Sequence, residues 1–399
     1  MTKLKIALYT QTFPPKGGGV STSHYNIYNL LKDEYDIQVF AFNETVNEFD
    51  EQIVKLATIP LINRFILSLV KCRYKAKSKG SKLSNVKAII SSFIPVLKSH
   101  KYLRRFKPDI ILLPDFNIPA YLLQKPKGTK LVCFAHHNYS RFKNHILLEN
   151  SDWLDLDIAY SMEQSAMRKV DAIISPSYYM IQRYEGSTYN NKPVFRIPNF
   201  MEKDNFKALE SQAKTNTTLP RDRKIIYIPS AGSVVKGKRY IFEIVRRLLA
   251  HDNNLFFYLS GHLPDDLVYE LKEFKDHLYT PGHINWETNV IYMMQCDLGI
   301  TPNLEENFSN AILEGQAAGL PFVAFDTGGN KEIILDKETG FIVPYRDIEA
   351  LIEQSYNLIN NNQLRENFAN RSKEACYSRF NNTIIKAEYQ KAFEQIAQM

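Results

Sequence analysis

Residues 301–324 read TPNLEENFSNAILEGQAAGLPFVA, and this stretch decides the fold. A β-forming run, Leu298–Thr301, ends where it begins, and Ser309 has the side chain of a good helix N-cap. Ala311, Ile312, Gln316 and Ala317 would set that helix against a second β-forming run at 321–324. The stretch therefore predicts a strand, an acidic loop, a helix and a second, parallel strand.

Strand and helix patterns alternate in the same way along the rest of the chain. Near-continuous Val, Ile and Leu with little alternation is typical of strands covered by helices on both faces. In the first half such runs are Lys5–Tyr9, Ile37–Ala41, Ile110–Leu113, Leu131–Ala135, Ala172–Ser175 and Val194–Ile197. In the second half they are Ile225–Pro229, Leu255–Ser260, Leu298–Thr301, Pro321–Ala324 and Phe341–Val343. The chain is predicted to be α/β with parallel sheets.

The 399 residues fit two domains of ordinary size, and 44% hydrophobic with 23% charged residues is a globular composition. The polar stretch Glu202–Arg223 is predicted to be the interdomain linker. The tail has Ile385, Tyr389, Phe393 and Ile396 at helical spacing and should pack on one of the domains.

The spacing of the cysteines and the hydropathy of the chain indicate the cellular compartment in which we expect the protein. Cys72, Cys133, Cys296 and Cys376 are isolated, which is typical of reduced thiols in a cytosolic protein. The apolar start of the chain is too short for a signal peptide, and the run 59–70 is interrupted and too short to span a membrane. We expect a soluble or peripheral protein.

The net charge of +7 conceals one basic segment. Between Lys55 and Lys107 there are 14 Lys and Arg and no acid, so the remaining residues carry 36 bases against 43 acids. Residues 53–66 and 88–103 mix apolar and cationic side chains at roughly helical spacing, a pattern that suits an anionic membrane surface or a lipid-linked acceptor. A solvated face is the alternative. Nucleic acid is not expected, because aromatic residues for base stacking are sparse here.

Two glycine loops could hold phosphate. The first predicted strand is followed by Gly17-Gly18-Gly19, and the strand at 225–229 is followed by Gly232-Ser-Val-Val-Lys236-Gly237-Lys238. Free backbone N–H groups at a helix start suit an anion, and a lysine there can neutralise a diphosphate. A tight turn and a solvated lysine are the alternatives. The dinucleotide spacing is absent, and no acid ends the second strand, which argues against a nicotinamide enzyme.

Glu306 and Glu314 lie on either side of the predicted helix start at Ser309. A phosphate at that helix N-terminus would have one carboxylate on each side, placed to hold the hydroxyl pairs of a sugar and of a ribose. The alternative is solvated charge that compensates the helix dipole.

The spacing of these motifs resembles a known family. Glu306 and Glu314, then Ala317-Ala-Gly-Leu-Pro, Asp326-Thr-Gly-Gly-Asn330 and Thr339-Gly-Phe-Ile-Val, resemble the nucleotide-sugar signature of retaining GT-B glycosyltransferases of family 4. Three earlier segments resemble further motifs of this family: its first glycine loop, its hinge entry and its phosphate loop, at Phe13–Val20, Ile197–Phe200 and Gly232–Gly237.

The resemblance implies a GT-B fold, in which two Rossmann-like domains with parallel sheets face a central cleft. Residues 1–200 would bind the acceptor, and a helix at 380–399 would pack back on them. Residues 201–379 would bind the nucleotide sugar. The implied activity is the retaining transfer of a hexose or N-acetylhexosamine from a nucleoside-diphosphate sugar, with UDP favoured, to a cell-surface glycan or a lipid-linked acceptor.

Residue roles follow from the resemblance. Glu306, His136 and Lys236 would be catalytic, with Glu306 on the transferred sugar, and His136, His137 and Asn138 would lie on the acceptor side. Either histidine could face the reaction centre, and a core or capping role is the alternative for both. The donor-binding residues would be Gly18, Gly19, Gly232, Ser233, Lys236, Lys238, Asn307, Phe308, Ser309, Asn310 and Glu314. The family often has Arg where this chain has Ser233, so Lys238 or Arg239 could supply the second cation.

No metal or other cofactor is expected, because a lysine and backbone amides would do a cation's work. Asp155-Leu-Asp157 matches a metal motif of the other glycosyltransferase fold but reads as a helix start. A sugar-nucleotide epimerase and a non-catalytic sugar-nucleotide binder are the alternative functions. The expected location is cytoplasmic, peripheral on the inner face of the cell membrane, with residues 55–107 toward anionic lipid.

Overall fold

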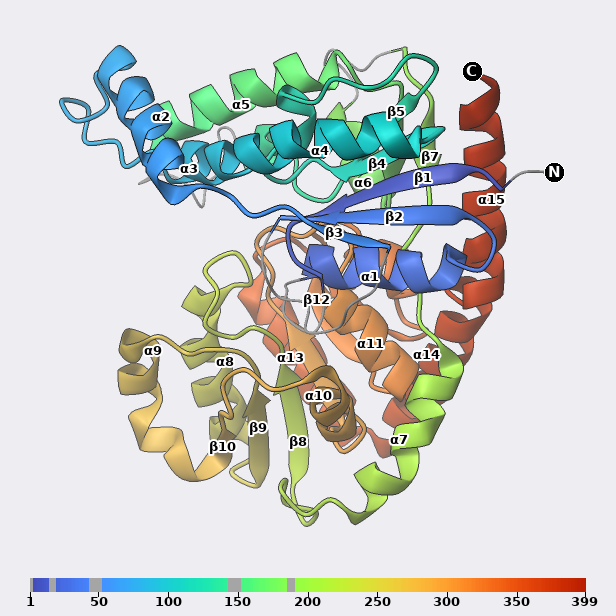
Figure 1. Ribbon diagram of the computed structural model, residues 1–399. Helices are drawn as coiled ribbons and strands as arrows, with labels where there is room; N and C mark the ends of the chain where they lie inside the picture. The colour runs from blue at the N-terminus through green and yellow to red at the C-terminus, as the bar shows by residue number, and fades with distance from the viewer. Residues whose placement is uncertain (1–2, 14–18, 43–51, 143–151, 185–190) are drawn as a thin grey trace. The chain divides into compact units, whose positions relative to one another are not determined.

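The computed structural model describes residues 3–13, 19–42, 52–142, 152–184 and 191–399. The chain forms two compact units, which are treated separately below. Unit 1 comprises Met1–Pro198 and Lys386–Met399, and unit 2 comprises Asn199–Ile385 (Figure 1).

Unit 1 contains a seven-stranded parallel sheet in the order β3-β2-β1-β4-β5-β6-β7. Its strands are β1 (Lys5–Thr10), β2 (Asp36–Ala41), β3 (Ile53–Lys55), β4 (Ile110–Pro114), β5 (Lys130–Phe134), β6 (Ala172–Ser175) and β7 (Val194–Arg196). Its helices are α1 (Gly19–Leu31), α2 (Pro60–Arg73), α3 (Ser84–Ser91), α4 (Phe93–Phe106), α5 (Trp153–Met167) and α6 (Tyr178–Tyr184). The strand order is that of a Rossmann-like domain.

Unit 2 repeats this architecture with six parallel strands in the order β10-β9-β8-β11-β12-β13. They are β8 (Lys224–Ile228), β9 (Leu255–Leu259), β10 (Leu278–Tyr279), β11 (Leu298–Thr301), β12 (Phe322–Phe325) and β13 (Gly340–Val343). Its helices are α7 (Lys203–Thr215), α8 (Lys238–His251), α9 (Asp265–Glu270), α10 (Trp286–Met293), α11 (Asn310–Ala318), α12 (Asn330–Ile333), α13 (Ile348–Asn360) and α14 (Asn362–Arg379). The predicted pair of parallel Rossmann-like sheets is confirmed.

The last helix, α15 (Asn382–Gln398), has the predicted apolar stripe. Ile385, Tyr389, Phe393 and Ile396 are all buried. From residue 386 onward the helix belongs to unit 1, where the Phe393 ring lies 5.5 Å from the ring of Tyr35 and Lys386 forms an ion pair with Glu34. This ion pair lowers the pKa of Glu34.

The prediction of a linker at Glu202–Arg223 is wrong. Most of this stretch is helix α7, which lies within unit 2, and Phe206, Leu209 and Ala213 on one of its faces are buried. Those three residues have helical spacing, whereas the polar composition describes only the outer face. The strands β3 and β10 were not predicted, and residues 53–55, expected to begin a helix, form β3.

Two glycines make room for one aromatic ring in unit 2. A Cβ at Gly299 of β11 would lie 2.3 Å from the Phe322 ring, and a Cβ at Gly315 of α11 would lie 2.4 Å from the same ring. Phe322 on β12 is fully buried. The ring therefore fixes how closely α11 approaches the sheet.

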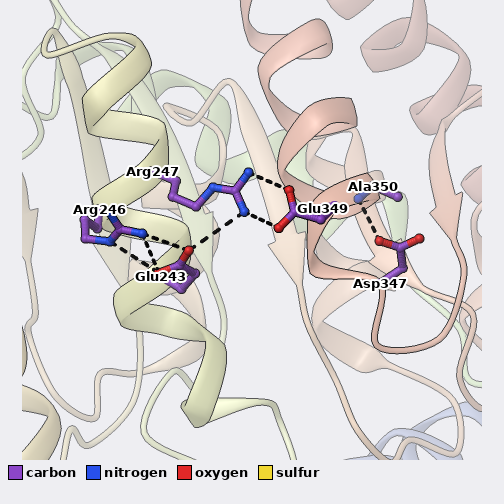
Figure 2. Close-up of polar contacts among 6 residues, drawn as sticks. All are labelled: Glu243, Arg246, Arg247, Asp347, Glu349 and Ala350. Atoms are coloured by element: carbon purple, nitrogen blue, oxygen red, sulfur yellow. Dashed lines mark hydrogen bonds and ion pairs between the residues drawn. The ribbon is translucent and has the colours of Figure 1, made fainter.

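On the surface of unit 2, α8 and α13 are joined by charged side chains (Figure 2). Arg247 donates to both carboxylate oxygens of Glu349 at 2.5 and 2.7 Å, and Arg246 donates to Glu243. These exposed pairs add little stability.

The substitution Gly315→Ala tests the packing around Phe322. An alanine would ordinarily strengthen a helix, but here its methyl group would overlap the Phe322 ring. We expect the free energy of unfolding to fall by about 1–2 kcal/mol, measured by denaturant titration.

The control is the double variant Gly315→Ala/Phe322→Leu, compared with each single variant. The smaller side chain relieves the overlap, so the double variant should lose less stability than the two single losses together. An unchanged or increased stability of Gly315→Ala would contradict this packing.

Candidate active site

The strand order of unit 2 reverses between β8 and β11, which are neighbours in the sheet. In open parallel sheets, ligands bind beyond the carboxyl ends of the strands at such a reversal. The loop after β8 carries Lys236, and the loop after β11 carries Glu306. The topology therefore brings together two of the predicted catalytic residues.

Backbone contacts join the two loops. The N–H groups of Leu304 and Glu305 both donate to the Val235 carbonyl, at 2.9 and 3.2 Å. Gly237 precedes α8 with a φ of 88°, and a Cβ there would lie 2.0 Å from the Pro302 carbonyl oxygen. Only glycine satisfies both the conformation and the close approach.

Glu306 is held by three donors. Lys236 forms an ion pair with its Oε2 atom, the Asn303 side-chain amide donates to the same oxygen at 3.0 Å, and the Asn307 N–H donates to Oε1 at 3.0 Å. The Glu306 residue is only 9% exposed, whereas 31% of the Lys236 side chain is exposed. A buried carboxylate is thus fixed beside a lysine whose side chain is partly exposed.

Two more loops complete this end of the sheet. After β12, a Cβ at Gly328 would lie 2.1 Å from the Glu306 carbonyl oxygen, and the Gly329 N–H donates to the Asn307 carbonyl at 2.7 Å. A Cβ at Gly232 would lie 2.1 Å from the carbonyl oxygen of His262, which follows β9. The glycines of the predicted motifs allow these close backbone approaches.

The helix start at Ser309 is confirmed. The Ser309 hydroxyl accepts from the Ile312 N–H at 3.4 Å, and Phe308 packs edge-on against Phe380 with the ring centres 5.6 Å apart. Within the first turn, Asn310 accepts a hydrogen bond from the side chain of Asn199 at 2.6 Å. The N-terminus of α11 is thereby fixed next to the loop that contains Glu306.

Glu314 lies one turn further into α11. Loss of hydration raises its pKa to about 7, and a hydrogen bond from Trp286 opposes this shift only in part. The charge of the Glu314 carboxyl group therefore changes near neutral pH, and the affinity of a ligand bound to this group would change with it.

Lys238 does not take part in the ion pair between Lys236 and Glu306. It forms an ion pair with Asp266 of α9. Ser233 instead organises the loop, because its carbonyl accepts the N–H groups of Lys236 and Lys238, both at 3.1 Å. In this structure Lys236 is the lysine that reaches Glu306.

A second group of predicted residues follows β5 in unit 1. The N–H groups of His136, His137 and Asn138 all donate to the carboxylate of Asp115, at 3.0, 2.8 and 2.8 Å. Tyr184 also donates to it through its hydroxyl, at 2.8 Å. Asp115 is buried, and burial raises its pKa. Sequence reasoning missed Asp115, although an acid directly after a buried strand was a usable signal.

The two histidine rings have different surroundings. His136 lies 4.2 Å from Phe134 and 5.4 Å from His24 of α1, measured between ring centres. His137 is surrounded by Phe116, Tyr139 and Phe142 at 5.1, 4.5 and 5.1 Å. Burial lowers the pKa of both, to about 3 for His137, so both imidazoles are neutral near pH 7.

The remaining predicted residues lie elsewhere. Gly18 is outside the described residues, and Gly19 is the first residue of α1. The Asp155-x-Asp157 motif lies at the start of α5, as predicted, and Asp155 accepts the backbone N–H groups of Asn85 and Val86. Over the described parts of the chain, no group of three or more His, Cys, Asp or Glu side chains could hold a metal ion.

Comparisons with known proteins bear on the family. Residues 17–205 match the family described as Glycosyltransferase Family 4, and residues 210–375 match the family described as Glycosyl transferases group 1. The capsular polysaccharide biosynthesis glycosyltransferase CapM of Staphylococcus aureus is 30% identical over 246 residues. That alignment covers 59% of this chain and 64% of CapM.

Solved structures share the fold. Sucrose-phosphate synthase from Thermosynechococcus elongatus superimposes with a TM-score of 0.78 at 15% identity and covers 99% of each chain. Anabaena HepE, solved with UDP and glucose, gives a TM-score of 0.70 at 15% identity over 98% of this chain and 100% of its own. With both units matched, the chain belongs to the GT-B glycosyltransferases of family 4, the glycosyl transferases of group 1.

Proposed function

We propose that the protein is a retaining glycosyltransferase that moves a hexose or N-acetylhexosamine from a UDP-sugar to a cell-surface glycan or a lipid-linked acceptor. The observation that carries this proposal is the contact between Lys236 and Glu306 at the point where the strand order of unit 2 reverses. The UDP and glucose bound to HepE support the donor class, and the role of CapM in capsular polysaccharide biosynthesis supports the acceptor class.

In this proposal the diphosphate of the donor lies between Lys236 and the N-terminus of α11. The side chain of Lys236 is partly exposed, and the backbone N–H groups at 308–310 lie at the positive end of the helix dipole. Glu306 would contact the transferred sugar, and Glu314 would accept hydrogen bonds from the ribose hydroxyls.

The chemical step breaks the bond between the anomeric carbon and the donor phosphate oxygen and forms a bond from the same carbon to an acceptor oxygen. The departing nucleoside diphosphate takes the bonding electrons, so Lys236 and the helix N-terminus stabilise the charge that develops on it. The acceptor hydroxyl passes its proton to the departing diphosphate oxygen. The fixed Glu306 carboxylate faces the positive charge that grows on the sugar ring.

On the acceptor side we assign the principal role to His136. Its neutral imidazole lies beside α1, the helix that follows the first glycine loop. Asp115 fixes the backbone of His136 by accepting its N–H group. A neutral imidazole can accept a hydrogen bond from an acceptor hydroxyl. His137 and Asn138 would support the same turn.

The acceptor would be met at an anionic membrane surface, through residues 55–107, on the cytoplasmic side. This arrangement needs no nucleic acid and no metal.

A panel of nucleotide sugars, scored for release of the nucleoside diphosphate in the presence and absence of acceptor glycans, tests the activity. We expect a UDP-sugar to react fastest and Glu306→Ala to lower kcat by at least about 100-fold, since the variant loses a charge held at the reacting sugar. Glu349→Gln, an exposed charge change on α13 (Figure 2), should leave kcat unchanged. A changed sugar without any transfer would instead indicate an epimerase, and binding without turnover would indicate a binding protein.

The pKa of Glu314 predicts how UDP affinity depends on pH. The ionised carboxylate would accept from both ribose hydroxyls, and protonation removes its charge and turns one acceptor oxygen into a donor, so UDP binding should weaken by up to about tenfold per pH unit below pH 7. The affinity for UDP is measured by calorimetry between pH 5.5 and 8 for the wild type and for Glu314→Gln. Titration of UDP itself affects both proteins equally, so the difference between the two profiles reports Glu314. An equally steep profile in the variant would rule out this role for Glu314.

Metal independence is tested with EDTA. Because Lys236 and backbone N–H groups would neutralise the diphosphate, we expect transfer to persist at full rate in excess EDTA. Loss of transfer with recovery on addition of Mn²⁺ would refute the metal-free mechanism.

A further inference from the structure

Helix α2 exposes an unusual amount of apolar surface. None of its 14 residues is buried. Leu61, Phe65 and Leu69 are 75%, 65% and 55% exposed, and Ile62 is 39% exposed. Large exposed apolar side chains grouped on one element mark an interaction surface, whereas scattered ones do not.

The helix has a second, inward face. Ile66, Leu67 and Val70 pack against a small cluster of Ala76, Leu83, Val86, Ile90 and Ile158. Since positions 61, 65, 69 and 72 recur every three or four residues, they form one continuous stripe on the opposite side. The outer stripe is therefore exposed even though α2 packs against the domain through its inward face.

Cations flank this stripe on α2 and recur along the segment that follows it. All 14 Lys and Arg between Lys55 and Lys107 are exposed. Apart from Lys55, none of them has a carboxylate partner within the described ranges of the chain. On α2 itself, Arg64 and Lys71 lie on one flank of the stripe and Arg73 on the other. Unpaired cations beside an apolar stripe match an anionic bilayer surface.

Two carboxylates hold this region in place. Asp152 accepts hydrogen bonds from the Ser81 hydroxyl and from the N–H groups of Lys82 and Leu83, at 2.6, 2.7 and 3.1 Å. Asp155 accepts from the first turn of α3. The segment after α2 is thus tied to α5, and Figure 1 shows α2 beside α3 at the edge of unit 1. A helix held in this way presents a fixed face and needs no folding transition to bind.

We propose that α2 is an interfacial anchor that lies in the surface of an anionic bilayer, with Leu61, Phe65, Leu69 and Cys72 among the acyl chains and the surrounding cations at the phosphates. Nothing among the described helices is long and apolar enough to cross a membrane, and at 14 residues α2 would lie along the surface. The stripe holds one aromatic residue, Phe65, which argues against nucleic acid, because proteins that bind single strands stack successive bases on several aromatic side chains. This inference deepens the proposed function, because it names the element through which the enzyme meets a membrane-borne acceptor.

Sedimentation of the full chain with vesicles tests the anchor. We expect binding to phosphatidylglycerol–phosphatidylcholine vesicles at low salt and little binding to pure phosphatidylcholine. The triple variant Leu61→Ser/Phe65→Ser/Leu69→Ser should bind the anionic vesicles at least about tenfold more weakly, because it loses the apolar contribution but keeps every charge. The matched control Val268→Ser/Tyr269→Ser, on the exposed face of α9, should bind as the wild type does.

Cys72 provides a direct reporter of insertion. It is exposed, whereas Cys133 and Cys376 are buried and Cys296 is half-buried. An environment-sensitive dye on Cys72 should shift to the blue on anionic vesicles and be quenched by lipids brominated in the acyl chains. An unshifted dye on bound protein would show that charge alone holds the protein and would overturn the insertion.

Two other results would also overturn the anchor. One is undiminished vesicle binding by the triple variant. The other is a wild-type dimer in light scattering that the triple variant converts to a monomer, which would make the stripe a contact between copies. Vesicle binding is measured without donor and UDP release without vesicles, so failure of the anchor and failure of the proposed transfer are separate outcomes.

Discussion

The candidate donor site depends on how closely two backbone segments of unit 2 approach each other. The Val235 carbonyl accepts two N–H groups from the loop after β11, and Gly237 lies against the Pro302 carbonyl with no room for a side chain. This approach places Lys236 against Glu306, although they are 70 residues apart in the chain. The carboxylate can then be buried because a cation is already beside it. The same arrangement leaves the Lys236 side chain partly exposed.

Most of the fold could be predicted from the sequence, because strands such as β4 and β12 are buried throughout and are therefore uniformly apolar. The strands β3 and β10 are only three and two residues long, too short to produce a pattern. Helix α7 was mistaken for a linker because its exposed face is rich in charged and amide residues. Its three buried residues, Phe206, Leu209 and Ala213, were visible only through their spacing. For α7 the polar composition was misleading, whereas the helical spacing of the apolar residues was informative.

The site was predictable where a residue type and its local context coincide, as at Ser309 at a helix start. It was not predictable where function depends on contacts between distant segments. Asp115 directly follows a buried strand, but its role emerges only when β4 and β5 lie side by side so that its carboxylate can accept three backbone N–H groups. Lys238 is a second example of a contact that the sequence does not reveal. Its partner, Asp266, belongs to a helix that no sequence motif connects to the glycine loop.

The Phe322 ring, seated between Gly299 and Gly315, has a consequence for how relatives of this chain can diverge. None of the three positions can change freely alone, since a side chain at either glycine overlaps the ring and a smaller residue at 322 leaves a void. The three positions should therefore covary across the family, with larger residues at 299 or 315 accompanied by smaller ones at 322. Because Gly315 adjoins Glu314, such compensated changes would also show which relatives tolerate a shift of α11 at this position.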